Sequence, residues 1–129
     1  MRLLSPVHFV AAVLIALGAS LSPGAAQSAR APYEADMQRL AEILGALHYL
    51  RAICGANEGQ TWRNEMQALV DAEAPGGDRR ERLTGSFNRG YRGFQQTYRT
   101  CTPAANLAIR RYLDEGAKIA RDITARYAN

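Results

Sequence analysis

Four arginines in the region 78–101 have a spacing that places their guanidinium groups along one side of a helix. At about 100° per residue, Arg82, Arg89, Arg92 and Arg99 point in similar directions, nearly opposite an apolar stripe that begins at Leu83. Guanidinium groups bind phosphates and carboxylates through paired hydrogen bonds. Beyond its first turn, this helix has no acidic residue that would neutralise them. The pattern predicts an exposed anion-binding stripe, and the alternative is a solvated face in an arginine-rich chain.

Residues for ordinary enzyme chemistry are sparse. Outside the N-terminal segment the chain has one histidine, His48, with no companion at a metal-ligand spacing, so we predict no metal site and no cofactor. Small helical enzymes that cleave peptidoglycan use a single catalytic glutamate, and glycosidases in general need carboxylates beside a cleft. The acidic residues available for such a role are Glu42, Glu58, Glu65, Asp71 and Glu73. We therefore favour a non-enzymatic protein and keep the single-Glu envelope enzyme as the alternative.

The first 26 residues have the three parts of a secretory signal peptide. Arg2 supplies the positive charge, an apolar run of about 13 residues follows at 7–19, and Gly24-Ala25-Ala26 provides small residues for cleavage. The run is shorter than the ~20 residues that cross a bilayer. We predict cleavage after Ala26, no transmembrane anchor afterwards, and a periplasmic location.

Export would place Cys54 and Cys101 in an oxidising compartment, where an isolated pair forms a disulfide. A loop of this length stabilises the fold by about 4 kcal/mol in the chain-entropy model. The net charge of +4 falls to +3 when Arg2 is removed, which is too little to indicate nucleic-acid binding. The partner classes that remain are an anionic envelope component and an envelope protein.

Four helical segments are predicted in one domain at 34–129, after a flexible leader at 27–33. Apolar residues recur at spacings of three and four in 35–54, 61–74, 78–101 and 103–127, and no segment alternates like a strand. Short connections favour antiparallel neighbours, so the first and third helices run the same way and bring Cys54 and Cys101 to one end. The predicted fold class is an all-α, four-helix up-down bundle with one disulfide. The alternative is an irregular packing in which the short second helix caps the others.

Smaller signals concern the third and fourth helices. Gly85, Gly90 and Gly93 each cost about 1 kcal/mol relative to alanine within a helix, so another element is expected to pack close to that backbone. Asp78 and Glu81 have the spacing of a capping box. Thr102-Pro103 is typical of a helix start, with threonine as the N-cap.

Several short stretches also carry a family resemblance that covers the chain from about Tyr33 onward. These are Leu40-Ala41-Glu42-Ile43-Leu44-Gly45, His48-Tyr49-Leu50-Arg51, Cys54-Gly55, Phe87-Asn88-Arg89-Gly90-Tyr91 and Tyr98-Arg99-Thr100-Cys101-Thr102. The sequence resembles an uncharacterised family of small exported alphaproteobacterial helical proteins, a domain of unknown function. The resemblance implies a periplasmic setting, and it implies no activity and no functional residues.

Together these patterns predict a periplasmic helical protein that works by binding, with a role in envelope maintenance. Besides the single-Glu enzyme, a purely structural or stress-buffering helical protein is a further alternative. The sequence identifies no ligand, process or oligomeric state.

Overall fold

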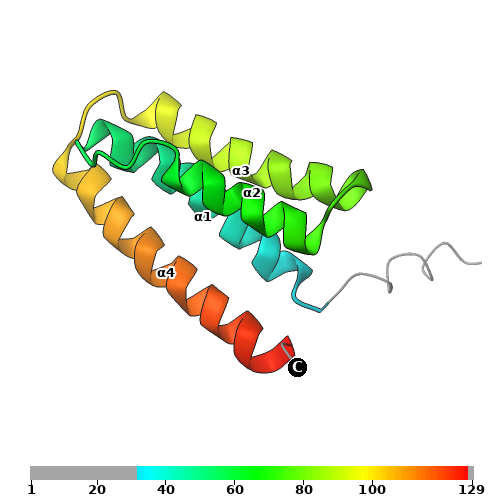
Figure 1. The fold of residues 1–129 in the computed structure, drawn as a ribbon. Coiled ribbons are helices and arrows are strands. Elements are labelled where there is room, and N and C mark those ends of the chain that lie inside the picture. Colours follow the sequence, from blue (N-terminus) through cyan, green and yellow to red (C-terminus); the bar gives the residue numbers. More distant parts are fainter. Residues whose placement is uncertain (1–31, 128–129) are drawn as a thin grey trace, which may run out of the picture.

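The computed structural model describes residues 32–127, which form four α-helices and, within that range, no strand (Figure 1). The helices are α1 (Glu34–Ile53), α2 (Thr61–Glu73), α3 (Gly77–Thr97) and α4 (Pro103–Tyr127). This confirms the all-α prediction, although α3 ends at Thr97 and does not continue to Cys101. The predicted signal peptide at 1–26 and the leader up to residue 31 lie outside the described residues.

Consecutive helices run in opposite directions, so α1 and α3 point the same way as predicted (Figure 1). Helix α1 occupies the centre, because it packs against each of the other three helices and most extensively against α3. No Cα atom of α4 lies within 8 Å of one in α2 or α3. The helix number and directions match an up-down bundle, but the four helices do not surround one shared core.

Burial on α1 extends well beyond the predicted apolar stripe. Ile43, Leu47 and Leu50 of the stripe are at most 2 % exposed, and the small residues Ala41 and Ala46 are equally buried. One apolar cluster joins α1 to α2 and α3, and a second joins it to the first half of α4 through Ala105 and Ile109. The burial of α1 on several sides thus makes it the common support of the other three helices.

Two glycines let the backbones of α1 and α3 come into direct contact. A Cβ atom at Gly45 of α1 would overlap the carbonyl of Phe87, with the carbonyl carbon 2.8 Å away. A Cβ atom at Gly90 of α3 would overlap the carbonyl of Glu42 in the same way. The predicted close approach is therefore confirmed at Gly90, whereas no such contact exists at Gly85 or Gly93.

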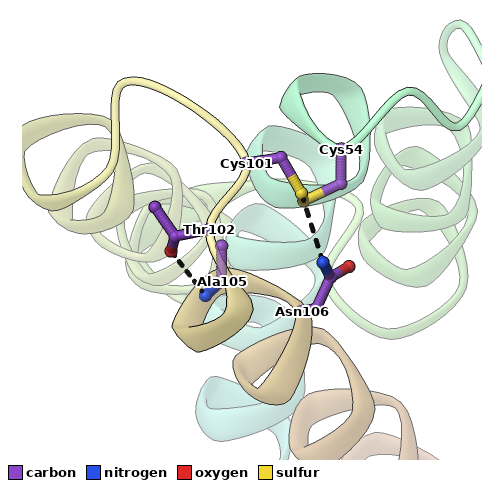
Figure 2. The surroundings of a disulfide bond; sticks show 5 residues. All are labelled: Cys54, Cys101, Thr102, Ala105 and Asn106. Carbon is purple, nitrogen blue, oxygen red and sulfur yellow. Dashed lines mark hydrogen bonds between the residues drawn. A yellow bond between two sulfur atoms is a disulfide. The ribbon is translucent and has the colours of Figure 1, made fainter.

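The predicted disulfide joins the end of α1 to the segment that follows α3 (Figure 2). The sulfur atoms of Cys54 and Cys101 lie 2.10 Å apart, and the amide of Asn106 lies 3.4 Å from the Cys101 sulfur. Thr102 is the N-cap of α4, because its hydroxyl accepts a hydrogen bond of 3.1 Å from the backbone N–H of Ala105. One end of the molecule is thus fixed by a covalent bond and a helix cap.

The predicted capping box at the start of α3 is wrong. The N-cap is Gly76, and it makes no side-chain cap hydrogen bond, while Asp78 is exposed. Arg79 orders this corner instead: its Nε donates to Glu34 Oε2 at 2.8 Å, and its Nη1 donates to the carbonyl of Glu73. The side chain of Arg79 thereby connects the starts of α1 and α3 with the end of α2.

Candidate functional site

A groove of about 530 Å³ lies between α2 and α3, and His48 of α1 contributes to its lining. We call it the α2–α3 groove. Its apolar residues are largely buried: Met66 and Val70 belong to α2 and Phe87 to α3. Around them stand cationic and neutral polar side chains. The complete lining consists of His48, Arg63, Met66, Gln67, Val70, Arg80, Thr84, Phe87, Asn88, Tyr91, Arg92 and Gln95.

The side of the groove that α3 forms is polar because polar residues recur at every fourth position of this helix. Arg80, Thr84, Asn88 and Arg92 occur at every fourth position, so they form a polar row along one side of the helix. Phe87 and Leu83 lie beside that row on the face that packs against α1. The core therefore fixes the rotation of α3, and this rotation presents the polar row to α2.

Three arginines line the α2–α3 groove, and no aspartate or glutamate does. Arg80 is partly neutralised from outside, because its Nη1 lies 3.2 Å from Asp71 Oδ1 and 3.4 Å from the carbonyls of Ala74 and Pro75. Arg63 and Arg92 are exposed and form no ion pair with any other described residue. The groove thus contains two unneutralised guanidinium groups.

Some arginines elsewhere in the fold do pair with carboxylates. Arg39 of α1 forms a two-point ion pair with Glu115 of α4, with N–O distances of 2.7 and 3.0 Å. Arg51 contacts Glu58 at 2.7 Å in the connection after α1. Arg63 and Arg92 share the lack of an ion pair with other described arginines, such as Arg110 of α4, but these two line one groove together.

Arg63 and Arg92 come from opposite walls and lie near the same end of the groove. Arg63 is the third residue of α2, and Arg92 is in the last third of α3. Because α2 and α3 run in opposite directions (Figure 1), the start of α2 and the last third of α3 both belong to the end of the groove nearer the disulfide. Arg80 and its partner Asp71 mark the other end. The unneutralised positive charge is therefore concentrated at one end of an elongated groove.

His48 stands between the aromatic and the cationic parts of the lining. Its ring centroid is 5.5 Å from that of Tyr91 and 5.9 Å from that of Phe87. Burial lowers the pKa of His48 below its ordinary value of 6.5, and the positive charge of Arg63 lowers that pKa further. The imidazole is consequently neutral at pH 7, and its buried Nδ1 has no hydrogen-bond partner among the described residues.

Three of the four arginines that the sequence placed in one stripe lie on α3, and their surroundings differ. Only Arg92 lines the α2–α3 groove. Arg89 donates to Ser86 Oγ at 2.8 Å, and Arg82 is half-buried with its Nε unpartnered. Arg99 lies beyond the end of α3, in the connection to α4, so a four-residue stripe on this helix is not formed. None of the four is paired with a carboxylate of α4: Glu115 binds Arg39, and Asp122 binds Lys118 at 2.6 Å.

Sequence reasoning missed Arg63 and Arg80 and gave His48 only a surface role. The four-residue spacing from Arg80 to Arg92 was visible and would have indicated a polar row beside the apolar one. No local signal placed Arg63 opposite that row, because the pairing depends on how α2 docks on α1.

A second groove, of about 520 Å³, lies between α2 and α4, with residues of α1 also lining it. Its lining is almost wholly apolar, with Leu40, Leu44 and Trp62 among its residues, and Glu65 is its one acidic residue. Among the carboxylates considered for catalysis, Glu58 has its pKa lowered, chiefly by the hydrogen bond from Arg51. A lowered pKa is the opposite of what a general acid requires.

Residues 32–127 contain no group of three or more His, Cys, Asp or Glu side chains that could hold a metal ion. None of the four helices is both long enough and apolar enough to cross a bilayer.

Comparison with known proteins gives one match. A family model described as "Protein of unknown function (DUF2385)" matches residues 32–127. No curated protein and no solved structure matches the chain.

Proposed function

Since the chain belongs to this family of unknown function, we propose a function from the α2–α3 groove itself: the protein binds an anionic component of the cell envelope there. Binding, and not catalysis, is the proposed activity. The proposal includes export to the periplasm, because the signal-peptide pattern of residues 1–26 would bring the domain to such ligands.

The observation that carries the proposal is the unneutralised charge of Arg63 and Arg92 at one end of the groove. Two guanidinium groups that line one groove repel each other. An anion bound between them would attract both, and these attractions would outweigh the repulsion. Arginine also offers several N–H donors in a planar arrangement that matches a carboxylate or a phosphate. An anionic ligand would therefore complete an arrangement that the protein leaves without counter-charge.

The shape of the site supports binding to something larger than a single ion. The volume of about 530 Å³ lies within the range of small-molecule sites, which are mostly apolar and contain a few well-placed polar groups. Met66, Val70 and Phe87 provide an apolar surface, which strengthens charge–charge contacts by excluding water from one side. The site thus combines positive charge at one end with an apolar surface along its length.

A binding experiment with a matched control tests the proposal. Inorganic phosphate and citrate are titrated into the isotope-labelled, disulfide-bonded protein, and amide shifts are followed by NMR. We expect saturable shifts around His48, Arg63 and Tyr91 that weaken as salt is added. The double variant Arg63→Gln/Arg92→Gln should lose them.

The control variant is Arg110→Gln/Arg121→Gln, which removes the same charge from exposed positions of α4. It should bind as the unmodified protein does. Equal weakening in both double variants would mean that net charge alone attracts the anions, and the proposed site would be abandoned.

Export has its own test. Mass spectrometry of the protein from the envelope fraction should find an N-terminus between Gln27 and Arg30. A chain in that fraction that still begins at Met1 would contradict the proposed processing.

A further inference from the structure

The neutral polar residues of the α2–α3 groove are more numerous than an isolated anion requires. Gln67 extends from α2, while Thr84, Asn88 and Gln95 extend from α3. Each amide offers two N–H donors and a carbonyl acceptor, and threonine offers a hydroxyl that both donates and accepts. At neutral pH acetate has no hydrogen-bond donor and inorganic phosphate has few hydroxyl groups, so neither anion would use all of these acceptors. A ligand rich in hydroxyl groups would use both the donors and the acceptors.

Along the groove, the residues that can bind a negative charge and the residues that can bind hydroxyl groups occupy different positions. Arg63 and Arg92 stand at the end nearer the disulfide, and Gln95 lies one turn further along α3 in that direction. Asn88 and Thr84 extend from Arg92 toward the other end, at four-residue intervals. A ligand with its charge between the two arginines would therefore meet neutral polar groups on both sides of Arg92, Asn88 and Thr84 on one side and Gln95 on the other.

Aromatic rings form part of the same wall. His48 and Tyr91 both line the groove, with their planes tilted by 37° and their centroids 5.5 Å apart. Because His48 is neutral at pH 7, its ring does not repel the weakly positive C–H face of a pyranose. Flat aromatic faces beside amides are suited to a ring that carries hydroxyls around its edge and C–H groups on its faces.

We propose that the ligand of this groove is an acidic saccharide, a pyranose that carries a carboxylate or a phosphate. The inference rests on the proposed anion-binding function and extends it to a ligand class. Arg63 and Arg92 bind the acidic group, Asn88 and Gln95 bind hydroxyls, and the rings of Tyr91 and His48 face the sugar. Carboxylated and phosphorylated sugars share this chemistry, and the experiment distinguishes them.

The test is calorimetric titration of the disulfide-bonded protein with three groups of probes. Digalacturonate and glucose 6-phosphate represent the two acidic sugars. α-1,4-Galactobiose and glucose are the neutral counterparts, and acetate and inorganic phosphate are the free anions. We expect at least one acidic sugar to bind about tenfold more tightly than both its neutral counterpart and its free anion, as one or two added hydrogen bonds would give. The tighter of the two acidic sugars identifies the acidic group.

Variants separate the two parts of the site. Asn88→Ala/Gln95→Ala should reduce the affinity for the acidic sugar to that of the free anion, and should leave binding of the free anion unchanged. The matched control, Asn64→Ala/Gln96→Ala, removes one asparagine and one glutamine from exposed helix positions outside the groove and should change neither affinity.

Two outcomes would count against the inference in different ways. If acidic sugars bind no more tightly than acetate and phosphate, the saccharide is wrong and the anion-binding function stands. If no anion or acidic sugar binds at all, the proposed function is wrong as well. Equal loss of affinity in the groove variant and its control would also overturn the roles of Asn88 and Gln95.

Discussion

Helix α3 meets two neighbours in opposite ways. Toward α1 its backbone is in direct contact, because Gly45 and Gly90 remove the side chains that would hold the helices apart. Between α3 and α2, in contrast, lies a groove of about 530 Å³ that is lined by arginines and side-chain amides among other residues. The closed interface fixes the position and rotation of α3. The open one can then hold polar groups at defined places without contributing to the core.

The disulfide belongs to the closed side, and its removal should have the largest effect on stability. Cys54→Ser/Cys101→Ser is expected to lower the free energy of unfolding by about 4 kcal/mol, because the 47-residue separation leaves a long loop to be ordered. Urea denaturation of the oxidised protein and the variant measures the difference. The reduced unmodified protein should behave like the variant, and equal midpoints for all three would show that the bond does not support this interface.

The glycine contact should come next. Gly45→Ala and Gly90→Ala each place a Cβ atom against a backbone carbonyl of the facing helix, so each should cost about 2–3 kcal/mol. The matched control is Gly93→Ala, which meets nothing within 4 Å and should raise stability by up to about 1 kcal/mol through helix propensity. Thermal unfolding of the three variants tests the contrast. Similar effects at all three positions would mean that the α1–α3 interface is not closed by backbone contact.

A smaller, pH-dependent effect should come from His48, where the closed and open sides meet. Its pKa is lowered in the folded protein, so near its ordinary value of 6.5 the unfolded chain binds more protons than the folded one. Stability should therefore be fully present above that value and fall as the pH decreases through it. The melting temperature measured from about pH 8 to about pH 5.5 should show this decline.

The variant His48→Gln isolates that effect. It should show a flatter dependence over the same range, because the carboxylates with lowered pKa, such as Glu58 and Glu115, titrate at lower pH. A decline of the same size in the variant would assign it to other groups.

The smallest effect on stability should come from the arginines of the open side. Arg63→Gln/Arg92→Gln removes two exposed side chains that pair with no carboxylate among the described residues, so the free energy of unfolding should change by less than about 0.5 kcal/mol. The same denaturation assay provides the measurement. A marked loss would assign these arginines to the fold, and the comparison between the two sides of α3 would no longer hold.

Local patterns predicted the elements of this fold more reliably than their ends. Apolar residues at spacings of three and four identified all four helices, because one face of each is buried. Thr102 caps α4 as expected, since an N-cap needs only residues within one turn. The capping box at Asp78 failed because the chain turns earlier, at Gly76, and Arg79 organises the corner through contacts with α1 and α2.

The candidate site shows where such patterns stop being informative. The spacing of Arg82, Arg89, Arg92 and Arg99 described one helix face, but α3 ends before Arg99 and only Arg92 faces the groove. An angle on a helix says which residues lie together, and it does not say which neighbour they face. That depends on the contact between Gly45 and Phe87, which sets the rotation of α3 on α1.

The sequence by itself determined the helices and the pairing of Cys54 with Cys101, since each depends on residue type and spacing along the chain, and it indicated a close approach to α3 without selecting Gly90. Only the tertiary structure decided that α1 is central, that the backbone of α4 stays away from those of α2 and α3, and that Arg63 and Arg92 line one groove. The physical reason is that apolar residues favour burial of a helix face against any apolar partner and do not specify which helix that partner is. A helix such as α1, apolar on several sides, gives no periodic signal for which neighbour covers which side, and the position of each neighbour decides which polar residues come together.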